Sequence, residues 1–197
     1  MADQPPFFQA PESYKFLRTT IRDTILPKCI NNELRIWCAG CSTGQEPYSL
    51  AIMLQEGIRQ IKDWDLSILA TDISSARILK AKSGLYSQDE VSRGLPQKFK
   101  DRHFSAEENG WRILPDYRKL IDFRILNLIQ DWNDLPYLQP TYQNQVLTKI
   151  HATMHRHAIL FLGPNETPPD TSALFQSIGD NQAFLLNPIK RFSSHAP

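Results

Sequence analysis

The stretch RIWCAGCSTGQEPYSLAIML, residues 35–54, constrains the fold more than any other part of the sequence. Residues 35–39 are a short apolar run typical of a buried strand, and residues 47–60 have the apolar spacing of a helix that begins at a proline. Between them lies only a turn of small residues. Gly40 and Gly44 in this turn would let the backbone come close to a ligand. The stretch therefore predicts a strand, a turn and a helix arranged around a bound group.

The rest of the chain continues to alternate between strand-like and helix-like segments. Helices are expected at residues 11–29, 74–84 and 140–155, and strands at residues 66–74, 120–128, 158–163 and 183–188. Residues 88–104 look helical or irregular, and residues 111–120 look like short β pieces of a small antiparallel insert. The order strand, turn, helix, strand, helix is the beginning of a doubly wound parallel sheet.

Polar groups follow the ends of the predicted parallel strands, where open α/β sheets bind ligands. Asp72 ends the second strand, a position suited to hydrogen bonds with both hydroxyls of a ribose, and Asn127 ends a later one. A nucleoside-like cofactor would meet the turn and Asp72 together. A turn that only packs tightly and an aspartate that only caps a helix are the alternatives. The chain has neither G-x-G-x-x-G nor G-x-x-x-x-G-K-[ST], which disfavours dinucleotides and nucleoside triphosphates.

Cys38 and Cys41 form a C-x-x-C pair that suggests a metal or redox site. A single pair lacks the second pair of ligands of a closed zinc site, and the five histidines have no matching spacing. A redox pair would normally open a helix, whereas Cys38 belongs to the predicted strand. We therefore expect small buried thiols and no metal.

Composition excludes several classes of protein. The 197 residues suffice for one sizeable α/β domain, and a net charge of +1 gives no field that favours nucleic acid or an anionic membrane. Three cysteines make no disulfide framework. No apolar run approaches the roughly 20 residues of a membrane span, and the amino terminus lacks the pattern of a signal peptide. We expect a cytoplasmic monomer.

Four segments, taken in order, resemble the CheR family of S-adenosylmethionine-dependent chemotaxis methyltransferases, which esterify glutamates on chemoreceptors. They are RIWCAGCSTGQEPYSLAIML, ILATDISSARILKAKSGLYS, LIDFRILNL and ILFLGPNET. The GCSTG-x-EPYS block is the most specific, and the resemblance extends from about residue 7 to about residue 184. It implies one domain over residues 1–197, with the family's separate helical amino-terminal domain missing.

The resemblance also implies a fold and a set of partners. The fold is α/β, a Rossmann-like methyltransferase sheet that follows an N-terminal segment and helix (1–34) and carries a small antiparallel β insert (about 104–123). The cofactor is S-adenosyl-L-methionine, and the product is S-adenosyl-L-homocysteine. The partner is the cytoplasmic helices or the tail peptide of a chemoreceptor, which the insert docks in some members, with no nucleic acid and no membrane insertion.

Individual site residues follow from the same resemblance. The turn would approach the methionine part of the cofactor, Asp72 would bind its ribose, and two residues after a later strand would line the adenine. The cofactor-binding residues so implied are Ala39, Gly40, Gly44, Gln45, Asp72, Asn127 and Leu128.

Several residues depart from the family pattern at positions that contact the cofactor or the acceptor. Pro5 and Gln9 replace the threonine and arginine of Thr-x-Phe-Phe-Arg, and Gln45 replaces a glutamate. Between Pro136 and Tyr137 about a dozen residues are missing, enough for one core strand and its turn. The family's Arg-Asn pair has no counterpart there, and Tyr137 corresponds to the motif's tyrosine, a candidate catalytic residue.

These departures leave two main functions open, and a third has less support. One is a protein-glutamate O-methyltransferase with impaired activity, whose sheet lacks a central strand. The other is a catalytically inactive methyltransferase fold that binds a receptor or signalling partner. A methyltransferase with a different acceptor is conceivable on the same scaffold, because the arginine that orients the carboxylate is replaced. Losing a central strand would either shorten the sheet, with residues 158–163 moving inward, or destabilise the domain.

Overall fold

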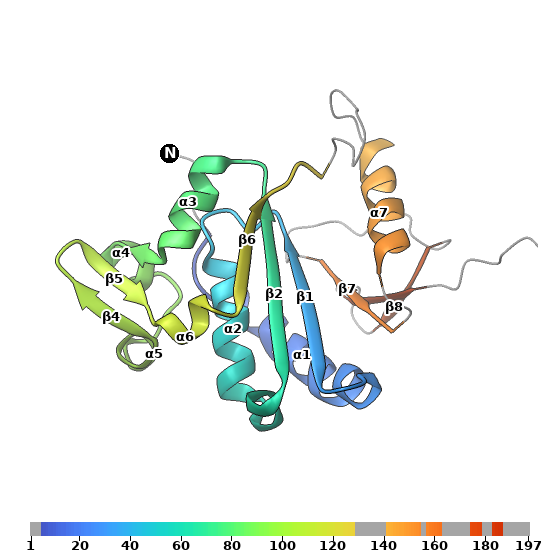
Figure 1. Ribbon diagram of the computed structural model, residues 1–197, viewed down its shortest axis with the longest axis horizontal. Helices are drawn as coiled ribbons and strands as arrows, with labels where there is room; N and C mark the ends of the chain where they lie inside the picture. The colour runs from blue at the N-terminus through green and yellow to red at the C-terminus, as the bar shows by residue number, and fades with distance from the viewer. Residues whose placement is uncertain (1–4, 129–140, 155–156, 163–173, 179–182, 187–197) are drawn as a thin grey trace, which may run out of the picture. The chain divides into compact units, whose positions relative to one another are not determined.

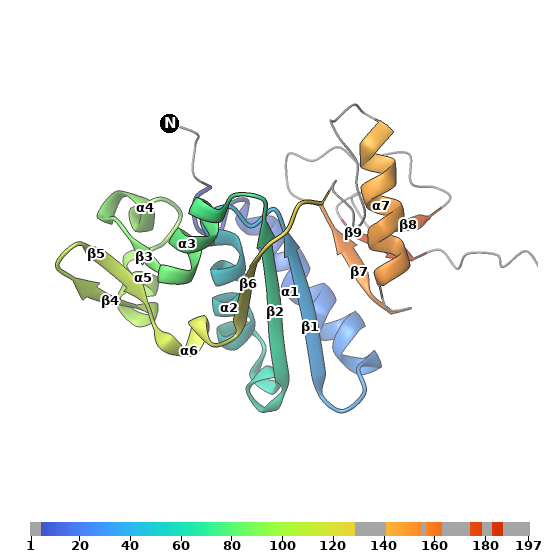
Figure 2. The same ribbon diagram turned by 45° about the horizontal axis from the view of Figure 1, so that its top comes forward.

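The computed structural model describes residues 5–128, 141–154, 157–162, 174–178 and 183–186. The chain divides into two compact units, Met1–Leu128 and Ile129–Pro197, which are described separately. Figure 1 and Figure 2 show their elements from two directions. The junction between Pro136 and Tyr137, and with it the predicted loss of a central strand, lies outside the described residues.

A parallel sheet forms the centre of the first unit, in the order β1-β2-β6. Its strands are β1 (Glu33–Ala39), β2 (Asp65–Asp72) and β6 (Ile121–Ile125). Helix α2 (Gln45–Gly57) and the 3-10 helix η3 (Arg59–Asp63) connect β1 to β2, and α3 (Ser75–Ser83) follows β2. Ser74 caps α3 through its hydroxyl, and Gly84 ends it with φ of 61°. The predicted α/β fold with a parallel sheet is confirmed.

Side chains alternate between the two faces of this sheet, as the pleat of a strand requires. Leu66, Ile68 and Ala70 of β2 are buried, and so are Ile121 and Phe123 of β6. The intervening residues of β6 are exposed. Helix α2 lies along the buried face in both views, with the rings of Tyr48 and Phe123 5.6 Å apart.

The N-terminal helical segment agrees with the prediction for residues 11–29. It comprises α1 (Pro11–Thr20), a π-helical turn η1 (Ile21–Ile25) and a 3-10 turn η2 (Leu26–Lys28). Just before it, the Phe7 ring is fully buried and packs edge-on against Tyr86 and Phe104, at centroid distances of 5.0 and 5.4 Å.

A small antiparallel sheet, here called the insert, has the order β3-β5-β4. Its strands are β3 (Leu85–Tyr86), β4 (Phe104–Glu107) and β5 (Gly110–Ile113), with α4 (Gln88–Ser92) and α5 (Gln97–His103) between β3 and β4. The expected insert is present, but it begins at Leu85 rather than near residue 104. Residues 115–118 were expected to be β-like, which is wrong: they form helix α6 (Pro115–Arg118), because Pro115 suits a first helical position.

The second unit contains helix α7 (Thr141–Thr153) and an antiparallel sheet in the order β7-β9-β8. The strands are β7 (Ile159–Phe161), β8 (Phe175–Ile178) and β9 (Ala183–Leu186). Leu147 and Phe175 form its small apolar core, and the ring of His151 contacts Phe175 edge-on at 5.4 Å. The helix and two of the strands were predicted, whereas β8 was missed because its four residues alternate too briefly to stand out. One alternative had residues 158–163 moving inward in a shortened parallel sheet, which is wrong, because β7 pairs antiparallel with β9.

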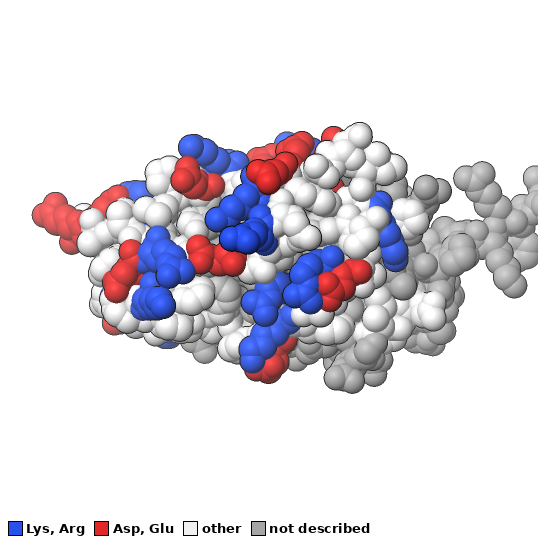
Figure 3. Space-filling view, turned by 90° about the horizontal axis from the view of Figure 1, so that it is seen from below, with Lys and Arg blue, Asp and Glu red and all other residues white. Residues whose placement is uncertain are grey.

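Charged side chains of both signs are interspersed on the face of the molecule shown in Figure 3. This arrangement agrees with the net charge of +1. Among the described residues, no helix has the length and apolar character needed to cross a membrane.

Candidate cofactor site

The turn after β1 is fixed by one backbone hydrogen bond to β2 and one within the turn itself. The Cys41 amide donates to the Thr71 carbonyl at 2.8 Å, and the Gly44 amide donates to the Cys41 carbonyl at 3.0 Å. Three residues of the turn have left-handed backbones: Gly40, Ser42 and Gly44, with φ of 75°, 50° and 97°. The turn is therefore a tightly wound loop, and glycine occupies two of its three left-handed positions.

The two glycines of this turn have different surroundings. Gly40 is exposed, and a Cβ atom placed on it would have no atom of the described residues within 4 Å, apart from Gly40 itself and its two chain neighbours. Gly44 is buried, and a Cβ atom there would come within 2.9 Å of both the Ala81 Cβ and the Tyr86 hydroxyl. Gly40 thus opens the turn toward a ligand, whereas Gly44 lets α3 and the insert pack against it.

Asp72 lies at the carboxyl end of β2 and is only 5% exposed. Its Oδ2 accepts a hydrogen bond from the Ser42 amide and its Oδ1 one from the Ser74 amide, both at 2.9 Å. The Arg77 guanidinium lies 4.0 Å from the carboxylate. Because each carboxylate oxygen can accept two hydrogen bonds, both oxygens retain capacity for ligand hydroxyls.

The register of the sheet brings the other predicted residues to the same edge. Asp72 pairs with Ile125, and the Leu126 amide donates to the Asp72 carbonyl at 3.0 Å. Asn127 and Leu128 follow directly and are half-buried, while Ala39 on β1 is exposed. The turn, Asp72 and the end of β6 therefore meet at one edge of the sheet.

Gln45 does not lie on the open side of the turn. It begins α2, is 1% exposed, and its Oε1 accepts a hydrogen bond from the Thr43 hydroxyl at 2.7 Å. Gln9 is exposed and Pro5 is half-buried, while Tyr137 lies outside the described residues. The structure thus gathers Ala39, Gly40, Asp72, Asn127 and Leu128, and it turns Gln45 and Gly44 toward the protein interior.

Cys38 at the end of β1 and Cys41 in the turn are buried thiols, as predicted. Cys38 is 3% exposed and Cys41 is 1% exposed. Burial raises the pKa of the Cys41 thiol to about 12, with further contributions from the carboxylates of Asp72 and Glu46. Burial likewise raises the pKa of Cys38 well above its ordinary value. The thiolate forms that would bind metal or react are therefore disfavoured at neutral pH.

Sequence reasoning missed one contact to the turn. Tyr86 of β3 is fully buried, and its hydroxyl donates to the Thr43 carbonyl at 2.8 Å. The only sequence signal was a tyrosine just after the Gly84 that ends α3. Nothing local in the sequence relates it to a turn 43 residues earlier.

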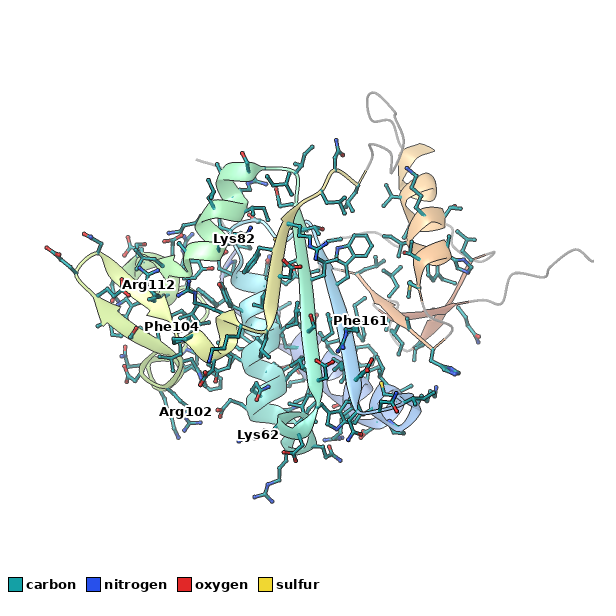
Figure 4. All side chains as sticks on the ribbon, viewed as in Figure 1. Lys62, Lys82, Arg102, Phe104, Arg112 and Phe161 are labelled. Atoms are coloured by element: carbon teal, nitrogen blue, oxygen red, sulfur yellow. The ribbon has the colours of Figure 1, made fainter. Side chains whose placement is uncertain are left out.

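A shallow cavity of about 360 Å³ was also not predicted, and it lies elsewhere in the first unit. Its lining includes Ile121 and Phe123 from the beginning of β6, together with Lys82, Arg118 and Lys119. Lys82, at the end of α3, is labelled in Figure 4 together with Arg112 of β5. The cavity is separate from the candidate site, because that site lies beyond the other end of β6.

The fold and this edge define a class of protein: a Rossmann-like α/β domain that binds a nucleoside-type cofactor beyond its parallel strands. Comparison with known proteins makes the class specific. Residues 4–184 match the family described as CheR methyltransferase, SAM binding domain. The chain therefore belongs to the CheR methyltransferase family, and S-adenosyl-L-methionine is the cofactor of this domain.

Individual relatives agree with this assignment. Chemotaxis protein methyltransferase 1 of Pseudomonas aeruginosa is 33% identical over 176 residues, covering 79% of this chain and 63% of that protein. Chemotaxis protein methyltransferase Cher2 of Pseudomonas putida is 31% identical, with the same coverage. The chain thus spans less than two thirds of the length of these relatives. A solved structure, the rRNA methyltransferase aviRa from Streptomyces viridochromogenes, is 15% identical in sequence and has a TM-score of 0.49. The match covers 94% of this chain and 87% of that one, and the likeness is too distant to support a conclusion.

The described residues fit this cofactor. Gly40 leaves open space beside the turn, and the Asp72 carboxylate has acceptor capacity for ribose hydroxyls. Asn127 and Leu128 are half-buried and follow β6 at the same edge of the sheet. Gln45 and Gly44 would act through the shape of the turn.

Proposed function

We propose that this domain is a protein-glutamate O-methyltransferase of the chemotaxis type, acting in the cytoplasm on glutamates of a chemoreceptor, with impaired activity. The observation that carries the proposal is the convergence of the open Gly40, the Asp72 carboxylate and the end of β6 at one sheet edge. The family assignment supplies the cofactor, and the names of the relatives supply the chemotaxis context.

The chemistry asked of the protein is mainly positioning. When bound, S-adenosyl-L-methionine supplies an activated methyl group on a sulfonium. An ionised glutamate is already a competent nucleophile, so its oxygen needs in-line placement and exclusion of water rather than a strong base. Ala39, Gly40, Asp72, Asn127 and Leu128 would bind and orient the cofactor.

Impaired activity is proposed because Gln9 and Gln45 are neutral at two positions where the family has charged residues. Gln9 is exposed where the family has arginine, so the charged, two-pronged pairing with a carboxylate is lost. Gln45 uses its side-chain oxygen internally, on the Thr43 hydroxyl. These observations also support the second candidate, a module that binds a receptor or signalling partner without methyl transfer.

Cofactor binding and methyl transfer can be tested separately. Titration calorimetry should show S-adenosylhomocysteine binding to the wild-type chain. Asp72→Asn should weaken it about 10- to 100-fold, as expected for losing charged hydrogen bonds worth about 1.5–3 kcal/mol. Asp122→Asn is a control for the loss of a carboxylate elsewhere on the sheet, since this exposed side chain pairs with Arg124 at the beginning of β6 and should leave binding unchanged. No binding at millimolar ligand would refute the proposal.

Transfer is then measured with a labelled methyl donor and a receptor cytoplasmic fragment. A glutamate methyl ester is released by mild alkali, so base-labile label on the receptor would support the proposed reaction. Base-stable label would indicate a different acceptor. If the wild-type chain binds the receptor without methyl transfer and Gln9→Arg restores transfer, the neutral residue at position 9 limits activity. If Gln9→Arg does not restore transfer, the binding module is favoured.

A further inference from the structure

We propose that Tyr86 is a positioning residue that couples the insert to the cofactor turn, so that the folding state of the insert sets the affinity for the cofactor. This inference rests on the proposed cofactor site and deepens it. It assigns a role in cofactor binding to a residue that belongs to a different sheet from the binding residues.

The side chain of Tyr86 is fixed at the turn. Its hydroxyl donates to the Thr43 carbonyl at 2.8 Å in a fully buried position. Gly44 makes this approach possible, because any Cβ atom at that position would lie 2.9 Å from the same hydroxyl oxygen. Burial raises the pKa of Tyr86 well above its ordinary value, so the phenol stays a donor throughout the physiological pH range.

The backbone of Tyr86 belongs to the insert. It pairs with Trp111 of β5 in the antiparallel register. Gly110, at the start of β5, lies so close that a Cβ atom there would be 2.2 Å from the Tyr86 carbonyl oxygen. The ring packs edge-on against the Phe7 ring, with centroids 5.0 Å apart, and the Lys80 ammonium lies 5.2 Å from its centroid. Phe104, labelled in Figure 4, contacts Phe7 from β4.

The hydrogen bond to Thr43 fixes a peptide plane of the turn. The Thr43 carbonyl points to Tyr86, and the amide of the same peptide, that of Gly44, donates to Cys41 on the inner side of the turn. Without the phenol the carbonyl would be buried without a donor, which is unfavourable. Because Gly44 is free to change its backbone angles, the peptide can rotate, and the conformation that presents Gly40 to the ligand would become less populated.

Tyr48 provides a matched control within the same unit. It is also fully buried, and its hydroxyl also donates to a backbone carbonyl, that of Ala81 in α3, at 2.9 Å. Tyr86→Phe and Tyr48→Phe therefore each remove a hydrogen bond from a buried phenol to a backbone carbonyl. The Tyr48 hydroxyl also interacts with the Arg118 guanidinium. Only the Tyr86 bond ends on the cofactor turn.

The test is S-adenosylhomocysteine binding by calorimetry, with urea unfolding of each variant. We expect a similar small loss of stability in both variants, a Kd raised at least fivefold in Tyr86→Phe, and a Kd within twofold of wild type in Tyr48→Phe. Wild-type binding with an unchanged Kd in Tyr86→Phe would overturn this inference alone. Absence of wild-type binding would overturn it together with the proposed function.

Hydrogen exchange of the wild-type chain tests the coupling without any substitution. Since coupling between sites is reciprocal, S-adenosylhomocysteine should slow amide exchange in the insert strands β4 and β5 as well as in the turn. In Tyr86→Phe the protection should remain at the turn and disappear from the insert. Protection confined to the turn in the wild-type chain would contradict the proposal.

Discussion

Replacing each glycine of the cofactor turn by alanine should separate stability from binding. At Gly40 (φ of 75°) the new methyl group meets open space, so the only cost to folding is the left-handed backbone of a non-glycine residue, about 1–2 kcal/mol. At Gly44 (φ of 97°) the same backbone cost adds to a clash with Ala81 and Tyr86 at 2.9 Å. Overpacking of this kind costs about 1–3 kcal/mol, which brings the total to about 2–5 kcal/mol.

The two substitutions should differ in whether ligand binding or folding stability is affected more. Gly40→Ala places a methyl group in the space that the ligand would enter, and we expect the Kd for S-adenosylhomocysteine to rise at least tenfold, about 1.4 kcal/mol. Gly44→Ala should also weaken binding, because it displaces the Tyr86 hydroxyl, but its larger effect is on folding.

Urea unfolding and titration calorimetry on the two variants and the wild-type chain measure both quantities. If Gly40→Ala destabilises the fold as much as Gly44→Ala, the conclusion that Gly40 faces open space is wrong. If Gly40→Ala binds the ligand like wild type, the ligand does not approach the turn from the Gly40 side, and the placement of the cofactor must be revised.

Two further predictions concern titratable groups away from the turn. Burial lowers the pKa of His103, whose Nδ1 lies 2.8 Å from the Tyr117 hydroxyl. Between this lowered pKa and the ordinary value of about 6.5, the unfolded chain therefore binds more protons than the folded one. The free energy of unfolding in urea should therefore fall as the pH drops from 7 to 5, by up to about 1.4 kcal/mol per pH unit. His103→Gln should flatten this dependence. Equal slopes of stability against pH in the wild-type chain and the variant would refute the prediction. A thiol-reactive dye should label only the half-exposed Cys29 in the native chain and Cys38 and Cys41 only after unfolding, whereas three equally fast thiols would contradict their burial.

Local patterns in the sequence predicted the elements whose signal lies within a few residues. The strand, turn and helix around Gly40, the cap and end of α3, and the position of Asp72 were all readable, because periodicity and capping are local properties. Strand β3 was missed because it has only two residues and exists through its pairing with β5, more than 20 residues later. Its tyrosine therefore gave no sign of belonging to a sheet.

The candidate site was predictable in position but not in the orientation of its side chains. Sequence reasoning treated Gly40 and Gly44 as equivalent, yet one faces open space and the other faces α3 and Tyr86. It placed Gln45 among the cofactor contacts, whereas the side chain bonds to Thr43 inside the fold. Which way a residue points in a turn depends on left-handed backbone angles and on distant packing, and neither is written in the local pattern.

The two hydrogen bonds that Asp72 accepts from backbone amides affect how members of this family can diverge. The carboxylate holds the Ser42 amide and the Ser74 amide, so it secures a left-handed serine and the start of α3 whether or not a ligand is bound. A descendant that has lost methyl transfer would still be under selection to keep an acid at this position, because its replacement would loosen the fold. An aspartate conserved at this position is therefore poor evidence of surviving enzymatic activity, and outward-facing positions such as Gly40 are the better markers when active and inactive members are sorted.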